Sequence, residues 1–509
     1  MKLLEFLEDP FSKKAIHPAY GASCLHMRPA PEYASGEVVL ASVYRNVGFG
    51  KTIESQVPAN GRKLKKRIER GRRGANGIGI GVDSWRSILE SCLRSPKQPN
   101  QSAKRFLQLC PLVPDAALYS SSARLSTNSW NPGQMVERII DHGCEDPGAA
   151  AHVWRSLHEA LSANDTSIED PWALAVQTEF TSWRDGQIEW QEQMFEASDS
   201  VCRWRSGGGT SPAGSFVRDL KEVLELKKHL TRRQWISMLE SLLRLASASH
   251  ALWLCKANAK AFKLLRSAVT GGALLSIDEL RNEHLAAGIT GFWSYGQRAA
   301  ETIRDHARDF VFARIGLNLL LSYIDDLHWM PDAELHIAVD SPQSLMRLAT
   351  MLQNRRAEFP RAEFEDKLHG IADSQPRLFA AKKGIGSNVA EFLRHCLGQR
   401  QTSEEGMKSY DQGYWLRKRG HYPSSPWIVS AGPVAVLLIA YCCARRRVGP
   451  TTVDDLCDHI CEYGLSIRAA DVLQSDLGAT LRHLGLTIDS PDAEGGMLVR
   501  NPFHVEGQD

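Results

Sequence analysis

The chain of 509 residues lacks the marks of an exported or membrane-spanning protein. Its first residues, MKLLEFLEDPF, carry Glu5, Glu8 and Asp9, whereas a secretory signal needs an uninterrupted apolar core after a basic start. The longest apolar run, from Pro433 to Ala444, is shorter than the ~20 residues that cross a bilayer. We therefore predict a cytoplasmic protein without membrane contact, in which this run forms a buried helix.

Paired-cysteine motifs are also missing. The 11 cysteines include no C-x-x-C, and an odd number without a secretory signal argues against a disulfide framework. Cys457 and Cys461 fall on one face of an expected helix, with His459 pointing away, and two sulfurs alone do not make a zinc site. We expect reduced cysteines that serve as core residues.

Hydrophobic residues at 43% and charged residues at 24% are typical of a folded globular protein. A chain of this length is too long for one hydrophobic core, because a domain usually has about 100 to 200 residues. Polar stretches rich in Gly, Ser, Pro or Gln occur at 94–102, 206–215 and 398–406, and they mark boundaries because they bury little apolar surface. The predicted domains are a basic α+β unit (1–93), a helical domain (103–205), a helical body (216–397) and a C-terminal domain (427–509).

The fold class predicted from these patterns is mainly α and multidomain. In the small N-terminal unit, the run EVVLASVY at residues 37–44 indicates a strand because it is rich in β-branched residues. From Gln134 onward helices dominate. Residues 215–269 carry apolar positions at helical spacing over three expected helices, and residues 299–327 continue the same pattern.

The C-terminal region has a different layout. A helix from Val434 to Arg447 is followed by a second helix after Thr451, and a third helical stretch from Ile467 to Leu484 is broken near Ser475. The segment LTIDSPDAEGGMLVR then predicts two short strands joined by a long turn. Three helices closed by a β-hairpin resemble a winged-helix domain, and the resemblance covers Pro433 to about Arg500.

The net charge of this winged-helix-like end indicates what kind of partner it contacts. Winged helices that bind DNA place the third helix in the major groove and the wing on phosphate, so both should carry cations. Between Thr451 and Arg500, however, nine acidic residues oppose three arginines, a net charge of −6. Such a surface would repel a phosphate backbone. We therefore predict that the acidic end docks a protein partner.

The strongest candidate for a nucleic-acid contact lies near the N-terminus, between Gly61 and Arg73. Only Glu69 opposes eight cations in these 13 residues: Arg62, Lys63, Lys65, Lys66, Arg67, Arg70, Arg72 and Arg73. The net charge of +7 predicts contacts with phosphates and carries no base readout; the alternative is a solvated loop.

Two further groups of cations could extend such a phosphate-tracking groove. Lys256, Lys260 and Lys263 recur at helical spacing, and a second group runs from Arg417 to Arg419. Trp415 and Tyr422 flank that second group and could stack on bases. The alternative for each group is an exposed cationic face.

Enzymatic alternatives rest on incomplete motifs. Gly50, Lys51 and Thr52 match the end of the phosphate-binding-loop motif. However, Arg45 occupies the position of its first glycine, and Pro58 interrupts the helix that should follow. Lys382 and Lys383 precede GIGSN, where helix amides could bind an anion or Ser387 could cap the helix. An acidic and histidine-rich run could bind a divalent ion for phosphodiester hydrolysis: Asp325, Asp326, His328, Asp332, Glu334, His336 and Asp340.

The leading prediction is a non-enzymatic, nucleic-acid-associated subunit of a multiprotein assembly that needs no cofactor. Multigene bacterial systems for DNA processing or antiviral defence contain many subunits of this general kind. The alternatives are a metal-dependent nuclease centred on Asp325 to His336, a nucleotide binder at Lys51, and a pure protein-interaction scaffold.

Overall fold

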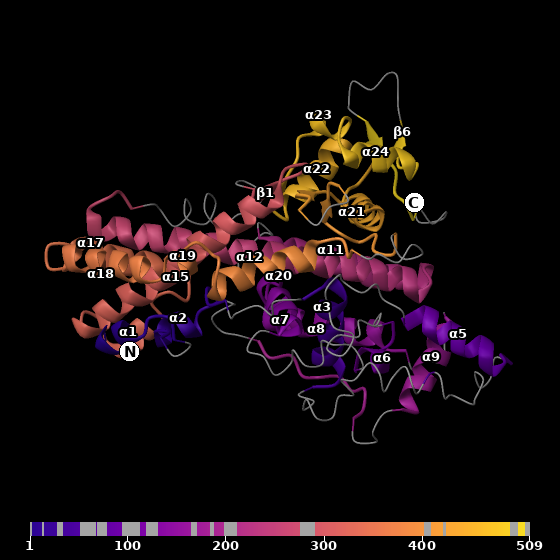
Figure 1. Cartoon of the computed structure of the whole chain (residues 1–509), viewed down its shortest axis with the longest axis horizontal. Coiled ribbons are helices and arrows are strands. Elements are labelled where there is room, and N and C mark those ends of the chain that lie inside the picture. The colour runs from indigo at the N-terminus through magenta and orange to yellow at the C-terminus, as the bar shows by residue number, and fades with distance from the viewer. Residues whose placement is uncertain are drawn as a thin grey trace.

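The computed structural model describes residues 3–12, 15–27, 34–50, 68, 79–93, 112–118, 131–163, 170–183, 188–197, 211–274, 291–401, 409–420, 424–488 and 497–503. Over these residues the protein is mainly helical with a few short strands, which confirms the predicted mainly α class (Figure 1). Within the same residues, no helix is both long enough and apolar enough to cross a bilayer.

The N-terminal part of the chain consists of short helices. Their bounds are α1 (Leu3–Glu8), α2 (Pro18–Ala22), α3 (Gly36–Gly48), α5 (Val82–Leu93), α6 (Pro114–Leu118), α7 (Pro132–Gly143), α8 (Pro147–Leu161) and α9 (Pro171–Thr181). Proline at the first turn and a preceding Asn or Asp cap start α7, α8 and α9, since proline needs no partner for a missing N–H there.

The strand predicted at residues 37–44 is wrong, because these residues form the middle of α3. Twelve of the 13 residues of α3 are buried, and the helix is surrounded by α6, α7, α8 and α12. A helix buried on every side has no polar stripe, and packing overrides the local preference of its valines for strands. Gly133 lets α7 approach the backbone of α3 closely, because a Cβ there would lie 2.4 Å from the Ser42 carbonyl oxygen.

The centre of the protein is built on one long helix. Instead of three helices over residues 215–269, the chain forms α11 (Pro212–Leu226), a short 3-10 turn η3 (Lys227–His229) and α12 (Arg232–Thr270), which is 39 residues long. A capping box between Thr231 and Gln234 starts α12, and Gly271, with a φ of 83°, ends it. α12 packs against α3, α7, α11 and several later helices, so it forms the axis of the core.

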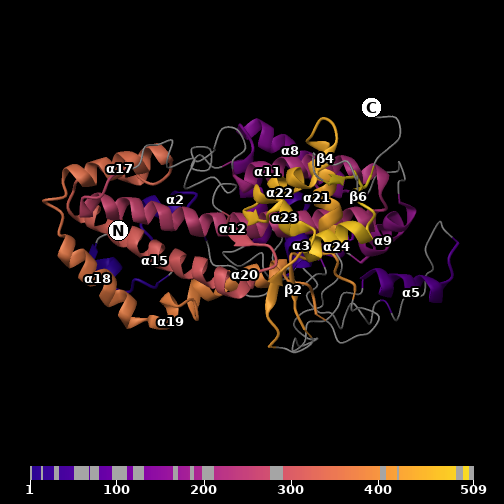
Figure 2. The same cartoon turned by 90° about the horizontal axis from the view of Figure 1, so that it is seen from above.

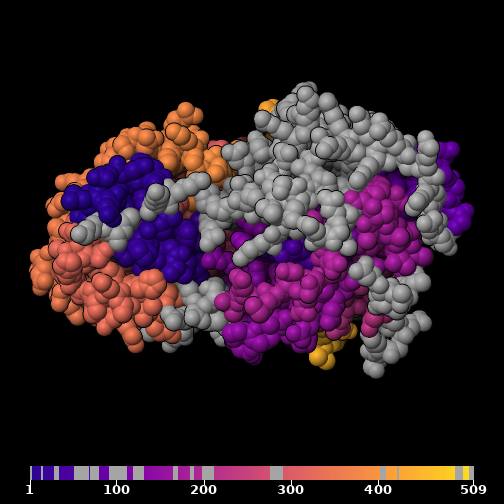
Figure 3. Space-filling view, turned by 90° about the horizontal axis from the view of Figure 1, so that it is seen from below, coloured from indigo at the N-terminus to yellow at the C-terminus, as the bar shows by residue number. Residues whose placement is uncertain are grey.

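One end of the molecule is a helical layer around α15 (Ala299–Asp326), which lies along α12. The layer continues with α16 (Asp332–His336), α17 (Pro342–Asn354), α18 (Arg361–Ser374), α19 (Pro376–Phe379) and α20 (Gly384–Leu397). α1 packs on α15 and α2 packs on α16, so the indigo N-terminal helices cover this end in the view from below (Figure 3).

The C-terminal module, residues 433–503, lies on top of α11 and α12 (Figure 1). Its elements are α21 (Pro433–Arg445), β4 (Thr451–Thr452), α22 (Val453–Cys461), β5 (Leu465–Ser466), α23 (Ala469–Val472), α24 (Asp476–His483), β6 (Thr487–Ile488) and β7 (Leu498–Val499). The expected break near Ser475 is present, since Ser475 caps α24. β6 and β7 pair antiparallel as the expected hairpin, and β4 pairs with the other edge of β7.

Two further strand pairs connect distant parts of the chain. β1 (Trp293–Ser294) pairs in parallel with β5 and so ties the start of the α15 layer to the C-terminal module. β2 (Leu416–Lys418) and β3 (Trp427–Val429) pair antiparallel between α20 and α21.

Candidate nucleic-acid interface

The basic segment predicted to contact phosphate lies outside the described residues. This holds for all eight of its cations, from Arg62 to Arg73, and also for Lys51, Thr52 and Tyr422. The second group, Arg417 to Arg419, lies within the described part of the chain.

Arg417, Lys418 and Arg419 lie on a β-hairpin. We call residues 416–420 and 424–429 the cationic hairpin. Arg417 is opposite Ile428 across the strand pair, and Arg298 bridges Ile428 from the other side. Residues aligned across neighbouring strands point to the same face. Arg417 and Arg298 therefore share one face of the hairpin, and both are exposed.

The other face of the cationic hairpin is occupied by a cation and an aromatic ring. Lys418 is opposite Trp427, and its Nζ lies 5.5 Å from the centre of the Trp427 ring. Trp427 also packs on Gly398, where an added Cβ would lie 3.2 Å from the ring. This face is thus joined to the end of α20.

The cationic hairpin lies next to α24, the last helix of the C-terminal module (Figure 2). Arg417 Nη2 is 2.6 Å from the Oδ2 atom of Asp476, the first residue of α24. The two side chains are 44% and 56% exposed, so their attraction contributes at most about 1 kcal/mol. The ion pair matters for position, because it brings three consecutive cations beside a helix that carries a carboxylate.

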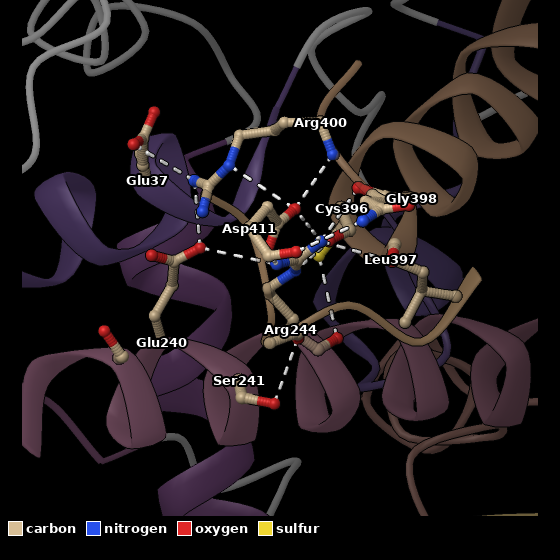
Figure 4. Close-up of polar contacts among 12 residues, drawn as sticks. Glu37, Glu240, Ser241, Arg244, Cys396, Leu397, Gly398, Arg400 and Asp411 are labelled. Atoms are coloured by element: carbon tan, nitrogen blue, oxygen red, sulfur yellow. Dashed lines mark hydrogen bonds and ion pairs between the residues drawn. The ribbon is translucent and has the colours of Figure 1, made fainter. Parts of the chain in front are cut away.

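A buried network beneath the cationic hairpin holds its base rigid (Figure 4). Arg244 of α12 is 1% exposed and donates from Nε to the Cys396 carbonyl (2.7 Å) and from Nη2 to the Gly398 carbonyl (2.8 Å). Its Nη1 donates to Asp411 Oδ1 at 2.8 Å. One guanidinium therefore binds both chain segments that lead to the hairpin.

A second buried arginine completes the network. Arg400 Nη1 lies 3.1 Å from Glu240 Oε1 and 3.2 Å from Glu37 Oε1, and its backbone N–H donates to Asp411 Oδ2 at 2.9 Å. Burial alone would raise the pKa of Asp411, but Arg244 and Arg400 lower it to about 2. The network stays ionised and joins α3 and α12 to Gly398, Arg400 and Asp411.

Trp415 cannot stack on bases, contrary to the prediction from the sequence. Its side chain is 1% exposed, and its Nε1 donates to the Ser241 carbonyl at 3.1 Å. Ser241 Oγ in turn donates to the Gly413 carbonyl at 3.0 Å. Trp415 therefore anchors the strand β2 to α12 instead of facing a ligand.

The C-terminal module is fastened to α11 by a buried carboxylate. Arg446 can only donate, so at 3.0 Å it gives its hydrogen to His459 Nδ1, and the proton on His459 sits at Nε2. That Nε2 donates to Asp219 Oδ2 at 2.9 Å, and the Tyr463 hydroxyl donates to the same oxygen at 2.6 Å. Burial would raise the pKa of Asp219, but these contacts outweigh it and lower the pKa. His459 does point away from Cys457 and Cys461, toward α11.

Much of the acidic charge counted in the C-terminal segment is neutralised within the chain. Four of the nine acidic residues pair with arginines: Asp455 with Arg447 (3.1 Å), Glu462 with Arg446 (2.7 Å), Asp471 with Arg468 (2.7 Å) and Asp476 with Arg417 (2.6 Å). Arg417, Arg446 and Arg447 precede Thr451, so the net charge of −6 omitted them. Asp489, Asp492 and Glu494 lie outside the described residues. Asp454 and Asp458 are exposed on α22 and make no ion pair with the described residues.

The acidic and histidine-rich run from Asp325 to Asp340 does not gather into a metal site. Among the described residues, no three His, Cys, Asp or Glu side chains lie close enough together to hold an ion. One histidine from outside the run lies near it: His17 Nε2 is 3.8 Å from Asp325 Oδ2. His17 Nδ1 accepts from the Ala19 N–H at 3.3 Å, so Nε2 keeps its proton and cannot ligate a metal.

Two further sets of cations differ from what the sequence suggested. Lys256, Lys260 and Lys263 do lie on α12, but Lys256 is half-buried against Phe292, and burial lowers its pKa to about 8. At Lys382 and Lys383, the expected helix cap is wrong, because Ser387 lies inside α20, whose N-cap is Lys383.

A groove of about 590 Å³ lies between the end of α11 and the C-terminal module, with Tyr441 and Phe503 in its lining. Its two arginines are already paired, Arg445 with Glu222 at 2.8 Å and Arg447 with Asp455. In the cationic hairpin Arg417 is also paired, with Asp476, but Arg419 is exposed and makes no ion pair with the described residues, so the hairpin is the stronger candidate for binding a polyanion. No family model matches this chain, and no curated protein matches it.

Proposed function

We propose that the protein is a non-enzymatic, nucleic-acid-associated subunit of a multiprotein assembly, such as a bacterial DNA defence or processing system. One observation carries the proposal: a rigid hairpin with three consecutive cations lies directly beside α24. The C-terminal module has the helices α21, α22 and α24, the short helix α23 and a terminal hairpin, and we assign it as winged-helix-like. In that arrangement α24 corresponds to the helix that faces nucleic acid.

The chemistry of the cationic hairpin suits phosphate. A guanidinium presents a planar fork that matches the oxygens of a phosphate group, and Arg417 and Arg419 are both exposed. The buried network under the hairpin limits the ordering cost of binding, because the strands are already held. Such contacts bind the backbone and read no bases. The basic segment from Arg62 to Arg73 remains a second proposed phosphate contact.

The protein partner is proposed to dock on the exposed part of α22. Asp454 and Asp458 lie one turn apart on that helix, so their carboxylates share a face. A basic partner surface would fit them. This part of the proposal keeps the predicted docking role of the acidic end, with fewer free carboxylates than the sequence suggested.

The proposal is tested by the salt dependence of nucleic-acid binding. A variant with Arg417→Gln, Lys418→Gln and Arg419→Gln should bind a labelled DNA more weakly than wild type. Removing one cation from a phosphate should lower the slope of log K against log salt by about 0.9. Arg417 and Arg419 are exposed, whereas Lys418 lies over Trp427 on the other face, so this variant should lower the slope by about 1.8. A second variant, with Gln at Arg62, Lys63, Lys65, Lys66 and Arg67, tests the basic segment separately.

The matched control replaces three other exposed cations by glutamine: Lys221, Lys228 and Arg347. It should leave the affinity and the salt slope unchanged. If the wild-type protein binds no DNA or RNA at low salt, the proposal fails and the protein-interaction scaffold stands. If Mg²⁺, Mn²⁺ or ATP raises the melting temperature, an enzymatic alternative replaces it.

A further inference from the structure

The edge of the molecule that leads to the cationic hairpin carries more cations. Arg377, Lys382 and Lys383 are exposed just before or at the start of α20, and none makes an ion pair with the described residues. Near the other end of α20, Arg394 lies 3.9 Å from Glu391, a long surface contact that leaves the guanidinium 43% exposed.

The edge is continuous with the cationic hairpin. α20 ends at Leu397, and Gly398 bridges Leu416 of β2 in parallel. The Gln399 N–H donates to the Leu416 carbonyl at 2.8 Å, and the Trp415 N–H donates to the Leu397 carbonyl at 2.9 Å. α19, α20 and β2 follow one another along one side of the molecule in Figure 2.

The edge is also rigid and straight. α20 buries Val389, Phe392 and Leu393, and it packs on α12 and α15. Its 14 residues span about 20 Å at roughly 1.5 Å per residue. The cations at the start of α20 and those of the hairpin are thus separated by about six phosphates of one strand, at roughly 3.4 Å each.

We propose that the edge of α20 and the cationic hairpin form one continuous site for the backbone of a nucleic-acid duplex. This inference rests on the proposed function and names the substrate class. Cations at both ends of one straight, buried-face helix suit the backbone of a stiff rod. Single-strand sites add aromatic platforms for stacking, but among the described aromatic residues at the hairpin, Trp415 is buried and the Trp427 ring is covered by Lys418 and packed on Gly398.

The test compares a duplex of about 20 base pairs with one of its strands, by fluorescence anisotropy at several salt concentrations. The variant Lys382→Glu/Lys383→Glu should weaken duplex binding at least tenfold and lower the salt slope by about 1.8. The matched control is Lys221→Glu/Lys228→Glu. Lys221 lies on α11, which is on the other side of α12 in Figure 2, and Lys228 lies in η3, directly after α11. This control should change duplex affinity less than twofold.

The outcomes separate this inference from the proposed function. If the hairpin variant loses binding while Lys382→Glu/Lys383→Glu does not, the continuous site is overturned and the proposed function stands. Equal affinity for the single strand and the duplex also overturns it. If the wild-type protein binds neither, both fail. Unchanged circular dichroism and melting temperature check that the exposed substitutions leave the fold intact.

Discussion

The buried arginine Arg244 offers the sharpest test of how the protein holds its cationic hairpin. Replacing it by methionine keeps the chain stem but removes the guanidinium. Three carbonyl groups, those of Cys396, Leu397 and Gly398, are then left without this donor, and Asp411 keeps only one of its two arginines. Breaking a buried pair by removing one partner costs about 3–5 kcal/mol, because the other charge stays buried.

The loss of stability should be local before it is global. A tenfold change in an equilibrium constant corresponds to about 1.4 kcal/mol. A loss of about 3 kcal/mol therefore makes local opening of the chain around the network roughly a hundredfold more frequent. Hydrogen exchange with mass spectrometry should show it at the amides that the network protects, Gln399, Arg400 and Trp415. Exchange there should accelerate about a hundredfold, while the amides in the middle of α15 stay protected.

The control is Arg394→Met, which deletes the same group from the same region. Arg394 is 43% exposed and lies 3.9 Å from Glu391, so its removal should cost less than about 1 kcal/mol. If Arg244→Met and Arg394→Met change exchange at Trp415 by the same small factor, the network does not hold the hairpin. The reasoning about a rigid platform would then be wrong.

Three other expectations follow from single residues. Burial lowers the pKa of His395 to about 4, below the ordinary 6.5, so the folded state binds fewer protons. The stability it contributes is complete above pH 6.5 and falls by up to about 3 kcal/mol toward pH 4; His395→Gln should flatten this slope in urea titrations. Asp219→Asn removes the anion that Arg446 contacts, and should cost about 3 kcal/mol and increase proteolysis at α22, unless the C-terminal module is held mainly by other contacts. Gly464→Ala should cost about 2–3 kcal/mol in thermal unfolding, because Gly464 has a φ of 76° and a Cβ would lie 2.1 Å from the Phe292 ring; no change in stability would mean that this ring gives way freely.

Local signals in the sequence were enough to predict where several helices and strands begin or end. A helix was predicted to begin after Thr451, and α22 does begin there, with a capping box between Thr452 and Asp455. The apolar run at residues 433–444 is a buried helix, and the segments around 487 and 498 pair as a hairpin. Each of these features depends on residues within a few positions of one another.

Sequence patterns led to wrong predictions for residues that are completely buried. The valines of α3 indicated a strand, because a helix enclosed on all sides shows no polar stripe to reveal its period. Cys457 and Cys461 were predicted to be core residues; Cys457 is buried, whereas Cys461 is half-buried. By contrast, the prediction that Trp415 faces a ligand is wrong, and its burial depends on Ser241, 174 residues away.

The amino-acid sequence by itself determined the mainly helical class, several helix caps and the run of three cations at Arg417 to Arg419, because these follow from neighbouring residues. Only the tertiary structure decided what surrounds those cations. Long-range contacts paired Arg417 with Asp476, fixed the hairpin on Arg244 and brought it to the end of α20. The physical reason is that a charge acts through its distance to other charges in space, and a count along the chain contains no such distances.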